Sequence, residues 1–135
     1  MPLLVDTGIL YALADGDDSW HARARKFFQS PQDGLITPVT VIPEVCYLLH
    51  DRMGARVELQ FVQAVERGEV VAAGLTAQDW NRLAEVMEEY PELGFVDASV
   101  VALAERLRLK AIVTTDRRHF AMVRPKHVKK FELLP

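Results

Sequence analysis

The chain has one cysteine in 135 residues, Cys46, and no apolar run long enough to cross a membrane. A single cysteine excludes an internal disulfide, and with it the small disulfide-stabilised folds of the cell exterior. Crossing a bilayer takes about 20 consecutive apolar residues, and no stretch approaches that length. The first residues also lack the basic and then apolar pattern of a secretory signal. We therefore expect a cytoplasmic protein without a membrane partner.

A strong excess of charge of one sign is missing too. The chain has 16 lysines and arginines against 19 acids, a net charge of −3, so its overall charge does not mark it as a polyanion binder. The basic residues of the C-terminal part nevertheless gather between Arg106 and Lys130. Half of the residues are hydrophobic and about a quarter are charged, as in soluble globular proteins. A chain of this length is most simply one domain, residues 1–135.

Short apolar runs alternate with stretches of helical periodicity. Five runs predict strands, the last at a sheet edge where its lysines would discourage further pairing: Leu3–Val5, Leu35–Thr37, Val70–Ala73, Ala111–Thr114 and Val128–Leu133. The stretches between them predict helices over about 9–13, 20–28, 40–53, 56–67, 77–90 and 97–108. This alternation predicts an α/β fold with a parallel sheet covered by helices on both faces.

Four acids stand beside short apolar stretches: Asp6, Glu44, Asp97 and Asp116, hereafter the four acids. Asp6 ends the first strand and Asp116 follows the fourth, so their carboxylates meet at one sheet edge if these strands are neighbours. Glu44 lies within the apolar stretch 41–49, which predicts partial burial. Asp97 stands at a helix start, where the helix dipole favours an anion.

Repulsion within such a cluster has to be neutralised. Two unit charges about 4 Å apart repel by roughly 4 kcal/mol at an effective dielectric constant of 20. The cluster would need protons or cations, and all-oxygen ligands suit Mg²⁺ or Mn²⁺. The alternative is that the acids are unrelated helix caps and surface groups; Asp6 or Thr7, for example, could simply cap the following helix.

The sequence resembles the PIN-domain family, and within it the VapC-type toxins of prokaryotic toxin–antitoxin pairs. The resemblance covers essentially the whole chain. It is carried by Leu4-Val5-Asp6-Thr7, by Glu44 in its apolar helix, by Gly94–Ala98, and by Thr114-Thr115-Asp116 followed by His119-Phe120. It implies a five-stranded parallel sheet and a metal-dependent ribonuclease with the four acids in its pocket. Gly8 departs from the pattern, because the family often has a polar residue there.

The chemistry that the resemblance implies is hydrolysis of RNA phosphodiester bonds by a water that one or two Mg²⁺ or Mn²⁺ ions activate. The four acids would be both catalytic residues and metal ligands, with Asp6 and Asp97 as the first choices for direct ligands. The residues expected to contact the RNA substrate are Thr7, Thr114, Thr115, Arg117 and His119.

The resemblance also implies a small antitoxin protein that inserts a segment into the acidic pocket. We expect its apolar part to lie in a groove near Trp20, Phe27, Phe28, Tyr47 and Leu48. The aromatic residues exceed what one small core obviously needs, and the same surface could support a homodimer.

Other readings of the sequence exist. The triplet Asp6-Thr7-Gly8 is also the signature of aspartic proteases, but these are all-β and this chain is mostly helical by periodicity. Phosphotransferases that form an aspartyl phosphate usually carry a second acid two residues after the first, where this chain has Gly8. A housekeeping PIN nuclease and a non-catalytic interaction domain stay open, and a metal-binding test separates the latter from an enzyme.

Overall fold

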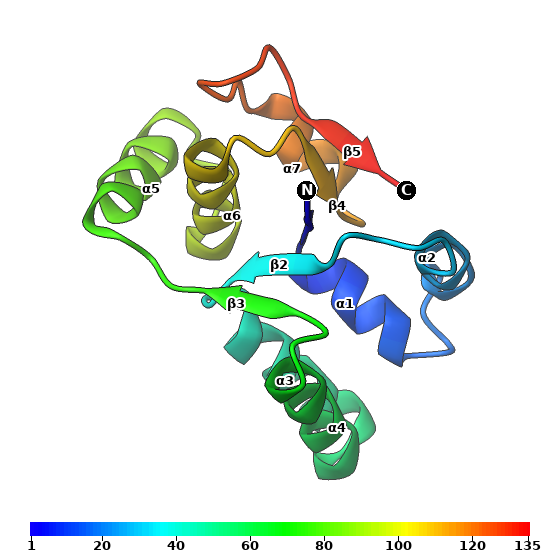
Figure 1. Cartoon of the computed structure of the whole chain (residues 1–135). Helices are drawn as coiled ribbons and strands as arrows, with labels where there is room; N and C mark the ends of the chain where they lie inside the picture. The colour runs from blue at the N-terminus through cyan, green and yellow to red at the C-terminus, as the bar shows by residue number, and fades with distance from the viewer.

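The structure is a computed structural model that describes residues 1–135, and it contains five strands and seven helices (Figure 1). The strands are β1 (Leu3–Val5), β2 (Leu35–Pro38), β3 (Val71–Ala73), β4 (Ala111–Val113) and β5 (Glu132–Leu134). The helices are α1 (Thr7–Ala14), α2 (His21–Phe28), α3 (Val41–Met53), α4 (Ala55–Glu66), α5 (Ala77–Glu89), α6 (Phe95–Leu107) and α7 (Arg117–Met122). None of the helices combines the length and the apolar character needed to cross a membrane.

The five strands form one parallel sheet in the order β3-β2-β1-β4-β5, which confirms the predicted α/β fold. The chain proceeds outward from β1 to β3 and then returns to the other side of β1 with β4. In open parallel sheets, ligands bind outside the carboxyl ends of the strands where the order reverses in this way. Here that place lies between β1 and β4, which pair with Leu4 opposite Ile112 and Val5 opposite Val113.

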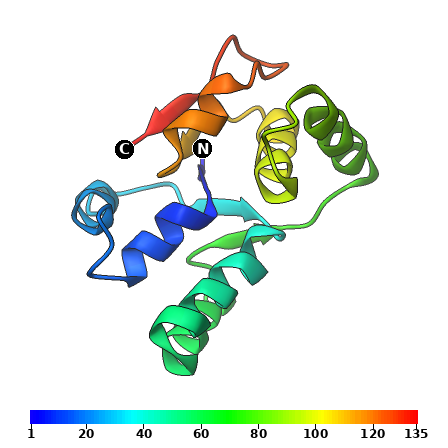
Figure 2. The same ribbon diagram turned by 180° about the vertical axis from the view of Figure 1, so that it is seen from behind.

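Helices cover both faces of the sheet. In Figures 1 and 2, α1, α3 and α4 lie on one side of β2 and β3, and α5 and α6 lie on the other, with the hairpin of α3 and α4 projecting furthest. The core lies between these layers. It includes Leu4 and Val5 of the central strand, and the continuous buried run 98–104 of α6, which is apolar on nearly every side.

The local structure differs from the prediction in two places. The last strand is Glu132–Leu134, because Lys129 and Lys130 stay exposed in the loop before it and cannot blunt the sheet edge as expected. The helix α7 after Asp116 was missed, since six residues are too few for a periodic signal. The aromatic residues Trp20, Phe27 and Phe28 are half-buried against the core, and the partner groove expected near them stays a prediction.

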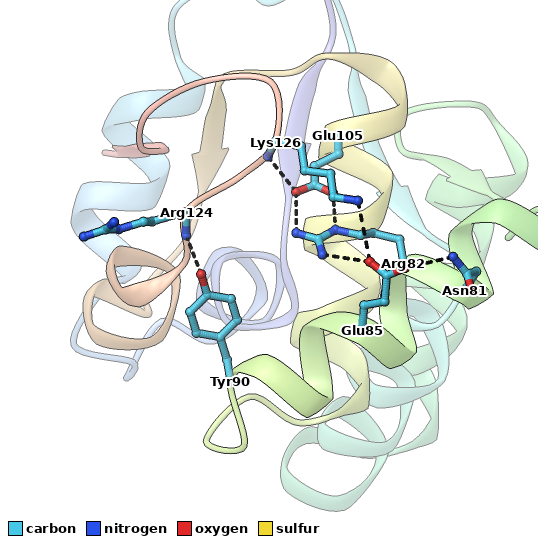
Figure 3. A network of polar contacts seen from close by, with 7 residues as sticks. All are labelled: Asn81, Arg82, Glu85, Tyr90, Glu105, Arg124 and Lys126. Atoms are coloured by element: carbon cyan, nitrogen blue, oxygen red, sulfur yellow. Dashed lines mark hydrogen bonds and ion pairs between the residues drawn. The ribbon is translucent and has the colours of Figure 1, made fainter.

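A network of ion pairs joins α5, α6 and the segment that leads into β5 (Figure 3). Arg82 donates from Nε and Nη2 to the two carboxylate oxygens of Glu105, at 2.7 and 3.2 Å, and pairs with Glu85 at 3.3 Å. Glu105 also accepts the backbone N–H of Lys126 at 2.9 Å. Both partners of the Arg82–Glu105 pair are largely buried, with side-chain exposures of 13% and 9%. The network therefore fixes the C-terminal segment to the α5–α6 layer.

A second buried pair lies beside this network. Arg106 donates from Nε to both carboxylate oxygens of Asp79, whose side chain is 2% exposed. Asp79 also accepts the backbone N–H of Thr76, and the Thr76 hydroxyl accepts that of Asp79. This reciprocal pair is a capping box at the start of α5.

Candidate active site

The carboxylate of Asp6 lies at the end of β1, at the point where the strand order reverses. It is the N-cap of α1, and its Oδ1 accepts the backbone N–H of Ile9 at 3.2 Å. Its Oδ2 accepts the hydroxyl proton of Thr114, which follows β4. The two alternatives weighed for Asp6 are therefore compatible, since one carboxylate oxygen caps the helix while the other faces the neighbouring strand.

Thr114 connects two of the four acids. Its hydroxyl donates to Asp6 and accepts the backbone N–H of Asp116 at 2.8 Å. The residue has no exposed surface. Both hydrogen-bonding roles of the hydroxyl are used inside the protein, where Thr114 positions the carboxylates of Asp6 and Asp116. The substrate contact expected of Thr114 stays a prediction.

Asp97, Asp116 and His119 bring one potential ligand atom each to within 4.8 Å of one another. Asp97 comes from the first turn of α6 and Asp116 is the N-cap of α7. The Oδ1 of Asp116 accepts the backbone N–H of His119 at 2.9 Å, and its Oδ2 lies 2.7 Å from His119 Nδ1. The short helix α7 thus turns the chain back so that His119 faces the acid that caps it.

Glu44 stands apart from this group in its exposure. We expected partial burial from its apolar neighbours, and this was wrong: Glu44 is exposed. The reason is helical geometry, because Val41, Val45 and Leu49 form the buried side of α3 and Glu44 falls outside it. It still lies close enough to Asp97 for its charge to raise the pKa of that carboxyl.

A pair of hydroxyls that sequence reasoning missed joins the elements carrying Glu44 and Asp97. Ser99 Oγ donates to the carbonyl of Val96 at 2.6 Å and lies 2.5 Å from Thr40 Oγ1. Because Ser99 has only one hydroxyl proton, Thr40 donates in the second bond. The one sequence signal for this contact is Ser99 itself, a polar residue within the apolar, buried part of α6.

The electrostatics of the site favour a bound cation or proton. Burial, reinforced by the charges of Asp97 and Asp116, raises the pKa of Asp6 from 3.8 to about 7, although hydrogen bonds from Thr114 and the Ile9 amide act in the opposite direction. Burial and the charge of Asp116 raise the pKa of Asp97 to about 6. No lysine or arginine forms an ion pair with any of the four acids.

Gly8 makes room for Thr115 in the wall of the site. A Cβ built on Gly8 would lie 2.2 Å from the Thr115 hydroxyl oxygen, so a larger residue at position 8 would force that side chain to move. Thr7 is buried and its hydroxyl oxygen has no hydrogen-bond partner. Arg117 is exposed and donates from Nη1 to the Leu133 carbonyl at 2.8 Å. The substrate roles of Thr7, Thr115, Arg117 and His119 stay predictions.

The PIN domain family matches residues 3–124 of the chain. Ribonuclease VapC26 of Mycobacterium tuberculosis is 31% identical over 135 residues, which cover 98% of this chain and all of the relative. The 23S rRNA-specific endonuclease VapC20 of the same organism is 31% identical over 108 residues, covering 77% of this chain and 81% of that protein.

Two solved structures share the fold. The crystal structure of M. tuberculosis VapC20, described as a sarcin-ricin loop cleaving toxin, aligns with a TM-score of 0.82 over 94% of this chain and 98% of that one, at 23% identity. A toxin–antitoxin complex from Klebsiella pneumoniae aligns with a TM-score of 0.72, covering 90% and 92% of the two chains at 21% identity. With four acids at the switch point of a five-stranded parallel sheet, the chain belongs to the PIN-domain family, among its VapC-type ribonucleases.

Proposed function

We propose that this VapC-type endoribonuclease hydrolyses RNA with a divalent cation held by Asp6, Asp97 and Asp116, and with Glu44 at the margin of the site. The observation that carries the proposal is the meeting of these carboxylates without a lysine or arginine partner, at the sheet edge where α/β proteins bind ligands. Two of them, Asp6 and Asp97, have raised pKa values because they are buried and repel their neighbours. A cation removes that repulsion.

The residues present fit a hard divalent ion. Carboxylate oxygens are the preferred ligands of Mg²⁺ and Mn²⁺, and the ligand atoms of Asp97, Asp116 and His119 are close enough together to share one ion. A bound Mg²⁺ or Mn²⁺ would supply the positive charge that lowers the pKa of water and stabilises negative charge on phosphate oxygens. It would also let an acidic pocket accept an anionic substrate.

The protein's own residues hold this site in place. Thr114 keeps the carboxylates of Asp6 and Asp116 at a fixed separation by donating to the first and accepting the amide proton next to the second. The Ser99–Thr40 contact holds the start of α6 against the start of α3. His119 lies against Asp116 at the edge of the group, where it can meet the substrate. Positioning of this kind supports catalysis because the groups need no rearrangement during the reaction.

The target that we propose is a single-stranded loop of RNA, and specifically of 23S ribosomal RNA. Sequence-specific proteins read loops because unstacked bases are accessible there, whereas the deep groove of an RNA helix excludes side chains. Support for ribosomal RNA comes from the VapC20 relative, which is named for 23S rRNA and whose structure is described as that of a sarcin-ricin loop cleaving toxin. Mapping cut sites on purified ribosomes tests this target.

The central experiment is incubation of the purified protein with structured RNA in Mg²⁺, in Mn²⁺ and in EDTA. We expect endonucleolytic cuts with either metal, none in EDTA, and none from Asp116→Asn. The matched control is Asp51→Asn in α3, which removes the charge of an exposed carboxylate that forms no ion pair. Cleavage that persists in EDTA, or a broad panel of RNAs left uncut in the presence of metal, would contradict the proposal.

An antitoxin partner is part of the same proposal. A cleft of about 340 Å³ between α1, α4, β2 and β3 is lined mainly by apolar residues, among them Leu10, Leu13, Val57, Phe61 and Val70. Leu59 and Val62 of α4 are exposed and available to a partner, whereas other apolar residues of the helix pack partly against the core. The K. pneumoniae toxin–antitoxin complex, which has the same fold, supports a protein partner. An antitoxin arginine suits the acidic pocket because its planar fork pairs with carboxylates.

A growth assay and a co-purification experiment test whether the chain has an antitoxin partner. Expression of this chain alone should slow growth of a bacterial host, and Asp6→Asn should relieve the effect. A small protein encoded beside it should co-purify through an arginine-bearing C-terminal segment, and Phe61→Glu should release it. Normal growth at high expression of active protein, with no co-purifying neighbour, would favour a housekeeping nuclease.

We also propose a homodimer through the exposed side of α5. Trp80 and Met87 lie on the same side of that helix, since seven residues make nearly two full turns, and both are exposed. The Trp80 ring also contacts exposed Phe95, with centroids 5.6 Å apart. Light scattering should give a dimer for the wild type and a monomer for Trp80→Glu. A wild-type monomer at high concentration would contradict this.

A further inference from the structure

A group of cations lies next to the site around one aromatic ring, and of its members only Arg117 has been given a role so far. It consists of Trp20, Arg23, Lys26 and Arg117, hereafter the α2 basic patch. The Arg23 guanidinium lies 4.7 Å from the centroid of the Trp20 ring, and the Arg117 guanidinium lies 5.5 Å from it. Residues from the start of α2 and from α7 therefore meet on one indole ring.

The Trp20 ring is half-buried against the core, and its backbone is held by neighbouring residues of the chain. The backbone N–H of Trp20 donates to Asp18 Oδ1 at 2.8 Å, and its carbonyl accepts the N–H of Ala24 at 2.9 Å. His21, the next residue, is hydrogen-bonded through Nδ1 to the Ala12 carbonyl at 2.7 Å, which fastens the segment to α1. Trp20 is thus a fixed support, and an arginine stacked on an indole loses little additional freedom when it binds an anion.

Arg117 joins this patch to the active site. It directly follows Asp116, and its guanidinium is held both by the Leu133 carbonyl and by the face of Trp20. The cations continue from it along α2, where Arg23 and Lys26 lie one turn apart. An RNA strand whose phosphate is at the four acids can therefore follow these cations away from the site.

The cations of the patch are available to a ligand. Neither Arg23, Lys26 nor Arg117 forms an ion pair with a carboxylate, and Arg23 and Lys26 are exposed. A cleft of about 470 Å³ beside α2 includes both cations, and no acidic side chain lines it: Arg23, Lys26, Phe27, Ser30, Gln32 and Pro135. Arg82 and Arg106 are the opposite case, since carboxylates already occupy their donors.

We infer that the α2 basic patch binds phosphates of the RNA strand next to the bond that is cut, and so positions the strand across the four acids. This inference rests on the proposed function. The occupant is RNA rather than an antitoxin segment, because a segment suited to the acidic pocket is itself cationic and would be repelled here. The guanidinium groups suit phosphate because their N–H donors match its oxygens in pairs.

The test compares two double variants that each remove two positive charges. Arg23→Gln/Lys26→Gln alters the patch, and Lys129→Gln/Lys130→Gln alters exposed lysines that line none of the clefts. Binding of a fluorescein-labelled hairpin RNA is measured by anisotropy in EDTA at several salt concentrations. We expect the first variant to bind about tenfold more weakly, and its salt slope to fall by about 1.4, the value for two phosphate contacts to a single strand. We expect the lysine variant to match the wild type.

A steady-state cleavage assay with Mn²⁺ adds a second measurement. The patch variant should have a raised KM and an unchanged kcat, whereas damage to the fold would lower kcat and the melting temperature together. Binding by the patch variant equal to wild type, or an equal loss in both double variants, would overturn the inference while leaving the nuclease intact. A wild type that neither binds nor cuts RNA would instead overturn the proposed function itself.

Discussion

Asp79 and Glu105 each lie against an arginine, whereas Asp6, Asp97 and Asp116 lie against one another. Both groups include carboxylates with little exposed surface, in the same small protein. The paired acids hold α5, α6 and the C-terminal segment together, so arginines of the same fold neutralise their charges. Figure 3 shows the pair of Glu105 with Arg82. The second group has no lysine or arginine partner, and only His119 lies beside it. This difference is what we expect from our proposal that the second group holds a cation from outside the chain.

The largest expected effect is on metal binding. Asp6→Asn and Asp97→Asn should each weaken Mn²⁺ binding by about 100-fold or more, because each removes an acid that we expect to be a direct ligand. Glu105→Gln makes the same chemical change in the paired group and should leave Mn²⁺ affinity unchanged. Titration calorimetry measures all three. Equal affinities across the series would remove the functional distinction between the two groups.

A smaller effect is expected in the paired group, where removing a charge should lower the stability of the fold. Asp79→Asn removes a buried charge whose partner, Arg106, is 31% exposed, and it weakens the capping box of α5. We expect it to lower the free energy of unfolding by about 2–3 kcal/mol, less than for a fully buried pair because water reaches the arginine. Urea unfolding at pH 7 measures the loss. A loss below about 0.5 kcal/mol would show that this pair does little for the fold.

For Asp6 we expect the reverse: the metal-free fold should be more stable when this carboxyl is uncharged. The pKa of Asp6 is about 7 in the folded chain and 3.8 ordinarily, so the folded chain holds this proton more tightly. That stabilisation is complete below about pH 4 and is lost as the pH rises through 7. The metal-free protein should therefore melt at lower temperature at pH 8 than at pH 5.

Asp6→Asn should remove part of the stability that the metal-free protein loses as the pH rises. The variant should be more stable than the metal-free wild type at pH 8, by about 1–2 kcal/mol or roughly 5 °C. Its melting temperature should also change less between pH 5 and pH 8. Calorimetry in EDTA measures both, and Mn²⁺ should restore the wild type alone. A wild type that is more stable than the variant at pH 8 would contradict the raised pKa.

The smallest effect is expected where a pair is exposed. Arg118 and Glu92 are 3.6 Å apart, with side-chain exposures of 79% and 58%. Arg118→Gln should change the free energy of unfolding by less than about 0.5 kcal/mol, because water and salt screen the attraction. Urea unfolding beside Asp79→Asn makes the comparison. A change as large as that of Asp79→Asn would mean that burial does not set the strength of these pairs.

Much of the fold follows from local sequence. The runs that become β1 and β4 are wholly apolar because the strands are covered on both faces. Asp6 directly follows the first run and Asp116 comes three residues after the second, which makes both acids conspicuous. The capping box at Thr76 is equally local. These features depend only on residues within a few positions, so a single sequence is enough to predict them.

The parts that sequence reasoning missed depend on contacts between distant elements. The exposure of Glu44 follows from which side of α3 faces the core, and its apolar neighbours alone could not tell this. The Ser99–Thr40 contact and the meeting of Arg117 with Trp20 each require two helices to pack at one particular place. No spacing along the chain encodes these contacts.

The bond between Asp6 and Thr114 spans 108 positions of sequence. During synthesis the first strand and its acid emerge early, but β4, the strand that aligns that acid with Asp116, is made only after most of the other elements. Contacts over such separations close late and slowly in folding. A growing chain that ends before β4 therefore carries Asp6 without Asp116, and the four acids can come together only after β4 and Asp116 have been made.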